Sequence, residues 1–89
     1  MLRLTRNAVA MIEALTQEAQ LPEGGLRIAQ DSERPGLRMH LVPSPGAEDD
    51  VLRAGEVRLF LDPVARNRLR DETLDARTNE AGSAFFLGS

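Results

Sequence analysis

Hydrophobic positions change their spacing after the first twenty residues, from a helical period to a strand period. Small and aliphatic residues recur at intervals of four, three and four at Ala8, Ile12, Leu15 and Ala19. This is the spacing of one face of an α-helix. Thr5 is suited to cap its first turn. The pattern predicts a long helix over residues 4–19, ended by Pro22 and by the Gly24-Gly25 pair, which permits left-handed backbone.

Three later segments alternate hydrophobic and polar residues, which is typical of β-strands with one buried face. They are residues 25–30, 37–42 and 56–61. A polar loop joins the first two, and its Pro35-Gly36 pair suits the centre of a type II turn. We therefore expect the first two strands to form a hairpin.

The second half of the chain predicts a short helix followed by further strands. Asp62-Pro63 is a typical helix start, because Asp caps the first turn and Pro fits the first helical position. This helix is expected to end near Leu69. An irregular link precedes the segment Val51-Leu52, and alternation resumes at residues 74–77, with a last strand at 84–87. The sequence thus predicts an α+β, mainly β domain with one N-terminal helix and one short second helix.

Composition favours a single folded domain of residues 1–89. A chain of 89 residues is too short for two hydrophobic cores, and its 42% hydrophobic and 28% charged residues are close to the globular average. The longest early apolar run, residues 8–12, is too short for a signal peptide or a membrane span. A cytoplasmic protein without membrane contact is the expectation.

Charge and missing residue types exclude several functions. The net charge is −3, which argues against binding to nucleic-acid phosphates. There is no Lys, so lysine-based covalent catalysis is impossible. No Gly-x-Ser-x-Gly elbow occurs, and one His would have to serve any triad. We therefore expect no enzyme activity.

Short strings along nearly the whole chain resemble one known family. They are Leu4-Thr5 with Ala8 and Ile12, Gly25-Leu26-Arg27-Ile28, Asp50-Val51, Gly55-Glu56-Val57, Phe60-Leu61-Asp62-Pro63, Leu69 with Asp71, Leu74-Asp75, and Gly82 with Phe85-Phe86. In this order they resemble the HesB-like, A-type iron-sulfur carriers. The resemblance implies a mixed β-sandwich or pseudo-barrel with the N-terminal helix along one side, and it implies homodimers.

The same resemblance implies cysteine ligands that this sequence does not contain. The family has one cysteine in a Gly-rich loop before the second strand and a Cys-x-Cys pair beyond the final strand. Here Arg34 or Pro35 stands about where the first thiol would be, the sequence stops at Gly88-Ser89, and there is no Cys at all. Cluster irons are held by thiolates, which a guanidinium or a proline cannot replace. No family ligand is carried over, and no cofactor is expected.

Three residues are the candidate interaction site: Arg34, Arg38 and His40. His40 is the one side chain that normally titrates near neutrality, and it alternates outward beside Arg38 on the predicted second strand. An ordinary half-exposed sheet histidine is the simpler interpretation. Other arginines, including Arg58 and Arg66, could extend this site to a basic surface patch, because arginine is favoured at protein interfaces. The intermixed acids favour the alternative of a solvated surface with scattered ion pairs.

The acidic run Glu48-Asp49-Asp50 is a weaker candidate, for a hard cation. Adjacent acids point in different directions and lack the alternating spacing of a calcium loop, so we expect a solvated loop.

The leading hypothesis is a non-catalytic HesB-like domain without the cluster-ligating cysteines that acts as a protein-interaction or regulatory module linked to iron-sulfur assembly, and that binds a protein partner or itself. The alternative is a metal or small-ligand binder that uses His40 with Asp31 or Glu33 in place of thiols.

Overall fold

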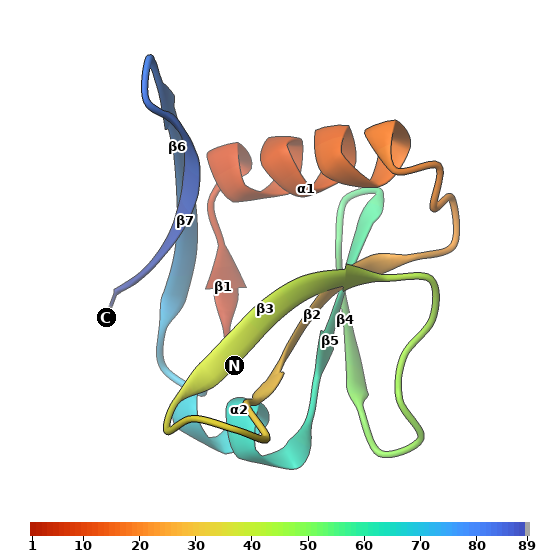
Figure 1. Ribbon diagram of the computed structural model, residues 1–89, viewed down its shortest axis with the longest axis vertical. Helices are drawn as coiled ribbons and strands as arrows, with labels where there is room; N and C mark the ends of the chain where they lie inside the picture. The colour runs from red at the N-terminus through yellow and green to blue at the C-terminus, as the bar shows by residue number, and fades with distance from the viewer. Residues whose placement is uncertain (89) are drawn as a thin grey trace.

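Two open β-sheets and two helices enclose one hydrophobic cluster in this computed structural model, which describes residues 1–88 (Figure 1). The elements follow in the order β1 (Arg3–Leu4), α1 (Arg6–Glu18), β2 (Gly25–Gln30), β3 (Leu37–Val42), β4 (Asp50–Ala54), β5 (Val57–Leu61), α2 (Pro63–Arg68), β6 (Thr73–Asn79) and β7 (Gly82–Gly88). The mainly β, α+β class is confirmed. The resemblance implied either a sandwich or a pseudo-barrel. Because both sheets are open, the structure is a sandwich and not a closed barrel.

The larger sheet has four strands in the order β3-β2-β5-β4. β2 and β3 form the predicted antiparallel hairpin, and β4 and β5 form a second one. The two hairpins join through a parallel pairing of β2 with β5, in which Leu26 lies opposite Leu59. β3 and β4 are therefore the two edges of this sheet.

The smaller sheet has three strands in the order β1-β6-β7. β6 and β7 form an antiparallel hairpin, and β1 pairs in parallel with the start of β6. The prediction that the helix begins at Leu4 was wrong by two residues. Leu4 instead pairs with Leu74, and Thr5 keeps an extended backbone, with φ −76° and ψ 164°.

α1 runs across one end of both sheets, and α2 lies at the opposite end (Figure 1). Thr5 caps α1 as predicted, because its Oγ1 accepts a hydrogen bond of 3.1 Å from the Ala8 amide. The same hydroxyl donates to Asp75 Oδ1 on β6 at 2.6 Å, so the helix start is fixed to the smaller sheet. Only Ala8 and Ile12 of the predicted stripe are buried. Leu15 is half-buried and Ala19 is exposed.

The helix ends on a left-handed residue that the sequence did not single out. Gln20 has φ 58°, whereas Gly24 and Gly25 have no left-handed φ. These glycines are needed for close packing: a Cβ at Gly25 would overlap the Arg58 carbonyl oxygen, and one at Gly24 would overlap that of Val42. The pair was assigned the wrong role.

Asp62 caps α2 as predicted and also fixes it to the larger sheet. Its Oδ1 accepts from the Ala65 amide at 2.8 Å, and its Oδ2 accepts from the Gln30 amide at 2.9 Å. One carboxylate thus joins the start of α2 to the end of β2.

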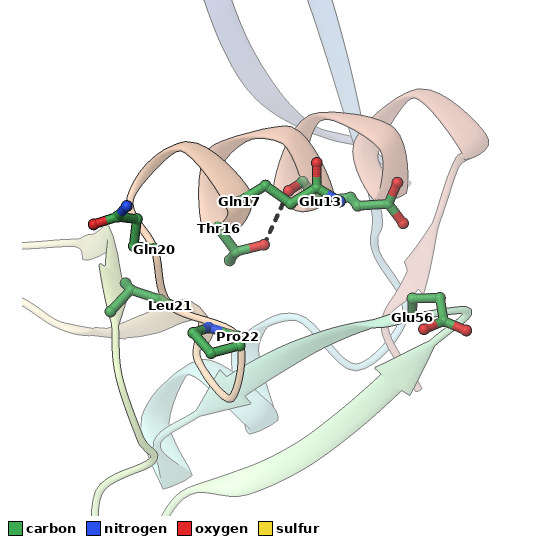
Figure 2. A pocket seen from close by; sticks show the side chains of 7 residues that line it. All are labelled: Glu13, Thr16, Gln17, Gln20, Leu21, Pro22 and Glu56. Carbon is green, nitrogen blue, oxygen red and sulfur yellow. Dashed lines mark hydrogen bonds between the residues drawn. The ribbon is translucent and has the colours of Figure 1, made fainter.

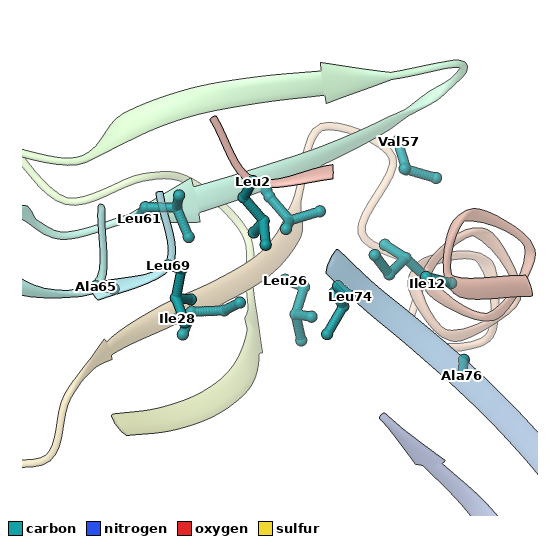
Figure 3. Close-up of a cluster of buried hydrophobic side chains, with 12 residues drawn as sticks. Leu2, Ile12, Leu26, Ile28, Val57, Leu61, Ala65, Leu69, Leu74 and Ala76 are labelled. Atoms are coloured by element: carbon teal, nitrogen blue, oxygen red, sulfur yellow. The ribbon is translucent and has the colours of Figure 1, made fainter. Parts of the chain in front are cut away.

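The core lies between the inner faces of the sheets and the helices (Figure 3). Its buried members are Leu2, Ala8, Ile12, Leu26, Ile28, Val57, Leu59, Leu61, Ala65, Leu69, Leu74 and Ala76. The residues on alternate positions of β2 and β5 supply the centre, as the period of two predicted. Phe60 is a buried residue that lies outside this cluster, on the other face of β5.

Candidate functional site

The outer face of the larger sheet, which points away from the core, carries most of the residues that could bind a ligand. One row across it consists of His40, Arg27, Phe60 and Val51, which pair with one another from β3 to β4. Directly paired residues share a face of the sheet. His40 and Arg38 lie two residues apart on β3 and therefore face the same way.

Residues 43–49, here called the strap, connect the two edges of this sheet and lie against its outer face. Pro43, Ser44 and Pro45 line a hollow of about 340 Å³ together with Val51 and Phe60. Phe60 is only 1% exposed, although it lies on the face that is turned away from the core. The strap and Phe60 line the same hollow, so the strap contributes to the cover over an aromatic side chain on the outer face.

A bidentate ion pair fixes the strap to the sheet. Arg27 Nε donates to Asp49 Oδ2 at 2.7 Å, and Arg27 Nη2 donates to Asp49 Oδ1 at 3.0 Å. The Gly46 amide donates to the same Oδ2 at 2.7 Å. The Asp49 side chain is 1% exposed. The hydrogen bonds from Arg27 hold the pKa of Asp49 below its usual range and raise that of Arg27.

The expectation of a solvated acidic loop was wrong for Asp49, because Arg27 and Gly46 supply the donors that compensate its burial. It holds for the neighbours: Glu48 is exposed. Asp50 makes a pair of 3.2 Å with Arg66 at the surface. The run supplies one buried structural carboxylate and no cation site.

His40 is half-buried, and within residues 1–88 its Nδ1 is buried without a hydrogen-bond partner. This nitrogen is closed off from solvent, so an ion could not reach it in this arrangement. Asp31 Oδ1 accepts from the Glu33 amide at 2.9 Å, which makes a local turn. No group of three His, Asp or Glu side chains in the described chain could hold a metal, so the alternative hypothesis gains no support.

The three predicted interaction residues are only partly brought together. Arg38 and His40 share the outer face of β3. Arg34 lies exposed in the β2–β3 loop, which is closed by a hydrogen bond of 3.1 Å from the Asp31 amide to the Gly36 carbonyl. Gly36 has φ 107°, so it takes the left-handed backbone that the predicted turn requires.

Arg53 and Arg58 add positive charge near the other edge of the same face. They are register partners on β4 and β5. Arg58 has a distant partner in Glu23, at 3.5 Å, and the Glu23 side chain is 83% exposed. Arg53 has no carboxylate within 4.0 Å among residues 1–88. The outer face is therefore basic on a chain of net charge −3.

Sequence reasoning missed Arg53, and it treated Arg27 only as part of a family string. Arg27 lies between the inward residues Leu26 and Ile28, so its outward direction could have been predicted. Its partner Asp49 is 22 residues away, and no local pattern connects the two.

A second hollow, of about 420 Å³, lies between the end of α1 and the β4–β5 turn (Figure 2). Its lining residues are Glu13, Thr16, Gln17, Gln20, Leu21, Pro22 and Glu56. The Thr16 hydroxyl donates to the carbonyl oxygens of Ile12 and Glu13, at 2.9 and 3.0 Å, so its hydrogen is already used within the helix. The hollow has neither a cation nor a nucleophile paired with a base, so we assign it no chemistry. No helix in residues 1–88 is both long enough and apolar enough to cross a membrane.

Three solved structures show the same fold. The chain matches Escherichia coli SufA, described as involved in the biosynthesis of iron-sulfur clusters, with a TM-score of 0.80 and 21% identity over 99% of this chain and 84% of that one. It matches IscA with a [2Fe-2S] cluster at a TM-score of 0.70 and 23% identity, over 100% and 82%. A protein from Aquifex aeolicus matches at a TM-score of 0.74 and 17% identity, over 99% and 90%.

These matches confirm the HesB-like fold that the short strings predicted. No family model matches the sequence, and no curated protein matches it either.

Proposed function

We propose that this chain is a cysteine-less HesB-like domain that works in iron-sulfur cluster assembly by binding another protein, and that it neither carries a cluster nor catalyses a reaction. The observation that carries the proposal is the combination of a carrier fold over 99% of the chain with no Cys in 89 residues. The link to assembly rests on the neighbours: SufA is described as involved in cluster biosynthesis, and IscA was solved with a cluster.

The loss of cluster binding follows from the chemistry of the side chains. Iron in such clusters is held by thiolates, and softer ligands supply most of the affinity. The β2–β3 loop offers Arg34 and Pro35 instead, and the face beside it offers Arg38. A protonated guanidinium donates hydrogen bonds, has no lone pair for a metal, and repels a cation.

Binding of a protein is supported by the basic outer face. Arg38 and His40 project from edge strand β3, and Arg34 is exposed in the adjoining loop. Arginine forms bidentate contacts with carboxylates and is enriched at interfaces. We propose that these three residues contact the partner, in the cytoplasm, and that the chain can also form a homodimer.

Anaerobic reconstitution tests the absence of a cluster. The purified chain and E. coli SufA are incubated side by side with ferrous iron, sulfide and reductant, and then desalted. We expect visible charge-transfer absorbance and retained iron for SufA and neither for this chain. A coloured chain with stoichiometric iron would overturn the non-carrier half of the proposal.

Affinity capture tests the binding half. The tagged chain and its Arg38→Glu variant are used to capture proteins from the native host, and the specific partner is then titrated with both purified forms. We expect the charge reversal to weaken binding by about tenfold or more. Equal binding of the two forms would show that β3 is not the contact surface.

A further inference from the structure

Two edge strands from different sheets flank a groove that the proposed function does not use. β4 is an edge of the larger sheet, and β1 is an edge of the smaller one. The groove has a volume of about 510 Å³, and its lining residues are Met1, Leu2, Leu4, Val51, Leu52, Arg53 and Ala54. A neighbouring hollow of about 330 Å³ shares Met1, Leu2 and Leu52 with it and adds Arg66 and Arg70.

The backbone of β4 is available on the groove side. Within residues 1–88, β4 pairs with β5 alone, and residues 50–54 make no backbone hydrogen bond to any other segment. An edge strand presents a row of N–H and C=O groups that an added strand can pair with. β4 has five residues, an ordinary length for a strand, so an extended peptide can pair along it as an added strand.

The groove also exposes apolar surface. Met1 is 80% exposed and Val51 is 44% exposed, and they are two of the four large hydrophobic side chains that lie open in the described chain. Leu52 is half-buried at the same edge. An added strand would place alternate side chains over Val51 and over Leu52, because successive residues of a strand point to opposite faces.

The charges select the kind of strand. Arg53 lines the groove and has no carboxylate within 4.0 Å among the described residues. In the neighbouring hollow, Arg66 is paired with Asp50, whereas Arg70 is hydrogen-bonded to the amide oxygen of Asn67, at 3.5 Å. Within residues 1–88, Arg53 and Arg70 therefore have no carboxylate partner. These cations are complementary to the carboxylates of an acidic segment.

We propose that the groove between β4 and β1 binds an extended acidic segment of a partner protein as an additional strand on β4. A carboxylate of the segment pairs with Arg53 on the face that also carries Val51, and an apolar side chain on the other face of the segment covers Leu52. This inference rests on the proposed function only in that the ligand is a protein. It concerns the β4 edge of the larger sheet, opposite the β3 edge that carries Arg38 and His40.

The test uses capped eight-residue peptides of alternating residues and the full chain labelled with nitrogen-15. The probes are a Glu-Val repeat, a Lys-Val repeat, and the Glu-Val repeat with N-methylated backbone amides on one edge. We expect the acidic peptide to shift the amide signals of residues 50–54 and 1–4. The basic and the N-methylated peptides should bind at least about tenfold more weakly.

Two charge-reversal variants locate the site. Arg53→Glu should weaken binding of the Glu-Val peptide by about tenfold or more and favour the Lys-Val peptide. Arg77→Glu, on the exposed part of β6, should bind as the wild type does. Both variants change surface side chains, and their unfolding midpoints are checked first.

Several results would overturn this inference. They are no binding of the acidic peptide at millimolar concentration, equal binding of the acidic and basic peptides, no effect of N-methylation, or a dimer of this chain that protects the β4 amides from exchange. None of these results affects the proposed function. That proposal still stands if the chain takes up no cluster and needs Arg38 to bind its partner. Conversely, a chain that binds iron and sulfide but also binds the peptide through Arg53 loses the proposed function and keeps this groove.

Discussion

β5 and β7 lie in different sheets and differ in how far the rest of the chain covers them. Four of the five residues of β5 are buried, including Phe60 on the outer face. None of the seven residues of β7 is buried, and only Phe85 is half-buried. The tip of the β6–β7 hairpin projects beyond α1 (Figure 1). The outer face of a sheet is buried only where further residues of the chain lie against it. Within residues 1–88, the larger sheet has such residues in the strap, whereas β7 is exposed along nearly its whole length.

The contrast also concerns polar contacts. The strap is fixed by the ion pair of Arg27 with Asp49, in which the carboxylate is buried and the guanidinium partly exposed. The hairpin is fixed at one end by the Thr5–Asp75 hydrogen bond, and its far end has an exposed hydroxyl contact between Thr78 and Ser83, at 3.1 Å. We therefore expect substitutions in the two regions to have very different effects on stability.

Truncation of Phe60 should give the largest effect. Phe60→Ala removes a fully buried aromatic ring and leaves a cavity beneath the strap, so we expect a loss of about 3–5 kcal/mol in the free energy of unfolding. Phe86→Ala, at a ring that is 45% exposed, should cost less than about 1 kcal/mol. Urea unfolding followed by circular dichroism measures both. Similar losses would show that the strap does not shield β5.

Removal of the Asp49 charge should have the next largest effect. Asp49→Asn removes the charge from a carboxylate that is 1% exposed and hydrogen-bonded to Arg27, whose side chain is 28% exposed, and we expect a loss of about 1–3 kcal/mol. Asp50→Asn is the matched control, because its pair with Arg66 is exposed, with side-chain exposures of 46% and 53%. It should cost less than about 1 kcal/mol. An equal cost for both would make the strap pair an ordinary surface contact.

The same pair makes stability depend on pH. The pKa of Asp49 is lowered in the folded state by the hydrogen bonds from Arg27, so its contribution is present above the unfolded pKa of about 4. It is lost as pH falls through the lower folded value. The difference in urea midpoint between wild type and Asp49→Asn should be constant from about pH 7 to 5 and shrink below about pH 4. A difference that persists in acid would contradict this.

At the smaller sheet, the end of β6 beside α1 should be more sensitive than the far end. Thr5→Ala removes the helix cap and the donor to Asp75, and we expect a loss of about 0.5–2 kcal/mol. Thr78→Ala, at the exposed end of β6, should change stability by less than about 0.5 kcal/mol. Thermal unfolding measures both, and the reverse order would mean that the hairpin is held at its tip.

The smallest effect is expected from Arg77, which lies over the exposed ring of Phe86 with its guanidinium carbon 5.2 Å from the ring centre. Arg77→Gln should cost about 0.5–1 kcal/mol, the range for cation–π contacts at exposed sites. Arg68→Gln, an exposed residue of α2, serves as the control. A difference of zero between the two would leave β7 held by Phe85 and the strand pairing alone.

Most of the fold could be predicted because its signals are local. The alternation in β2, β3 and β5 and the Asp62-Pro63 start of α2 depend on adjacent residues, and all are confirmed. β1 was missed because a strand of two residues has no period, and it exists through pairing with Leu74, far along the chain. Only the segment Val51-Leu52 was noticed within β4, whose polar ends interrupt the pattern.

The site was harder to predict because it depends on tertiary contacts. The outward directions of Arg38 and His40 follow from alternation, but the burial of Asp49 depends on the course of the strap over the sheet. The lack of a counter-charge at Arg53 likewise becomes visible only when all neighbouring carboxylates are placed.

The parallel contact between β2 and β5 also has a consequence for how the chain folds. Each hairpin of the larger sheet joins neighbouring segments, whereas the β2–β5 pairing joins segments that are distant in the sequence. Joining distant segments pays loop-closure entropy before it gains contacts, so this docking should set the folding rate. Kinetics of core variants at Leu26 and Leu59 that changed only the unfolding rate would argue against that order of assembly.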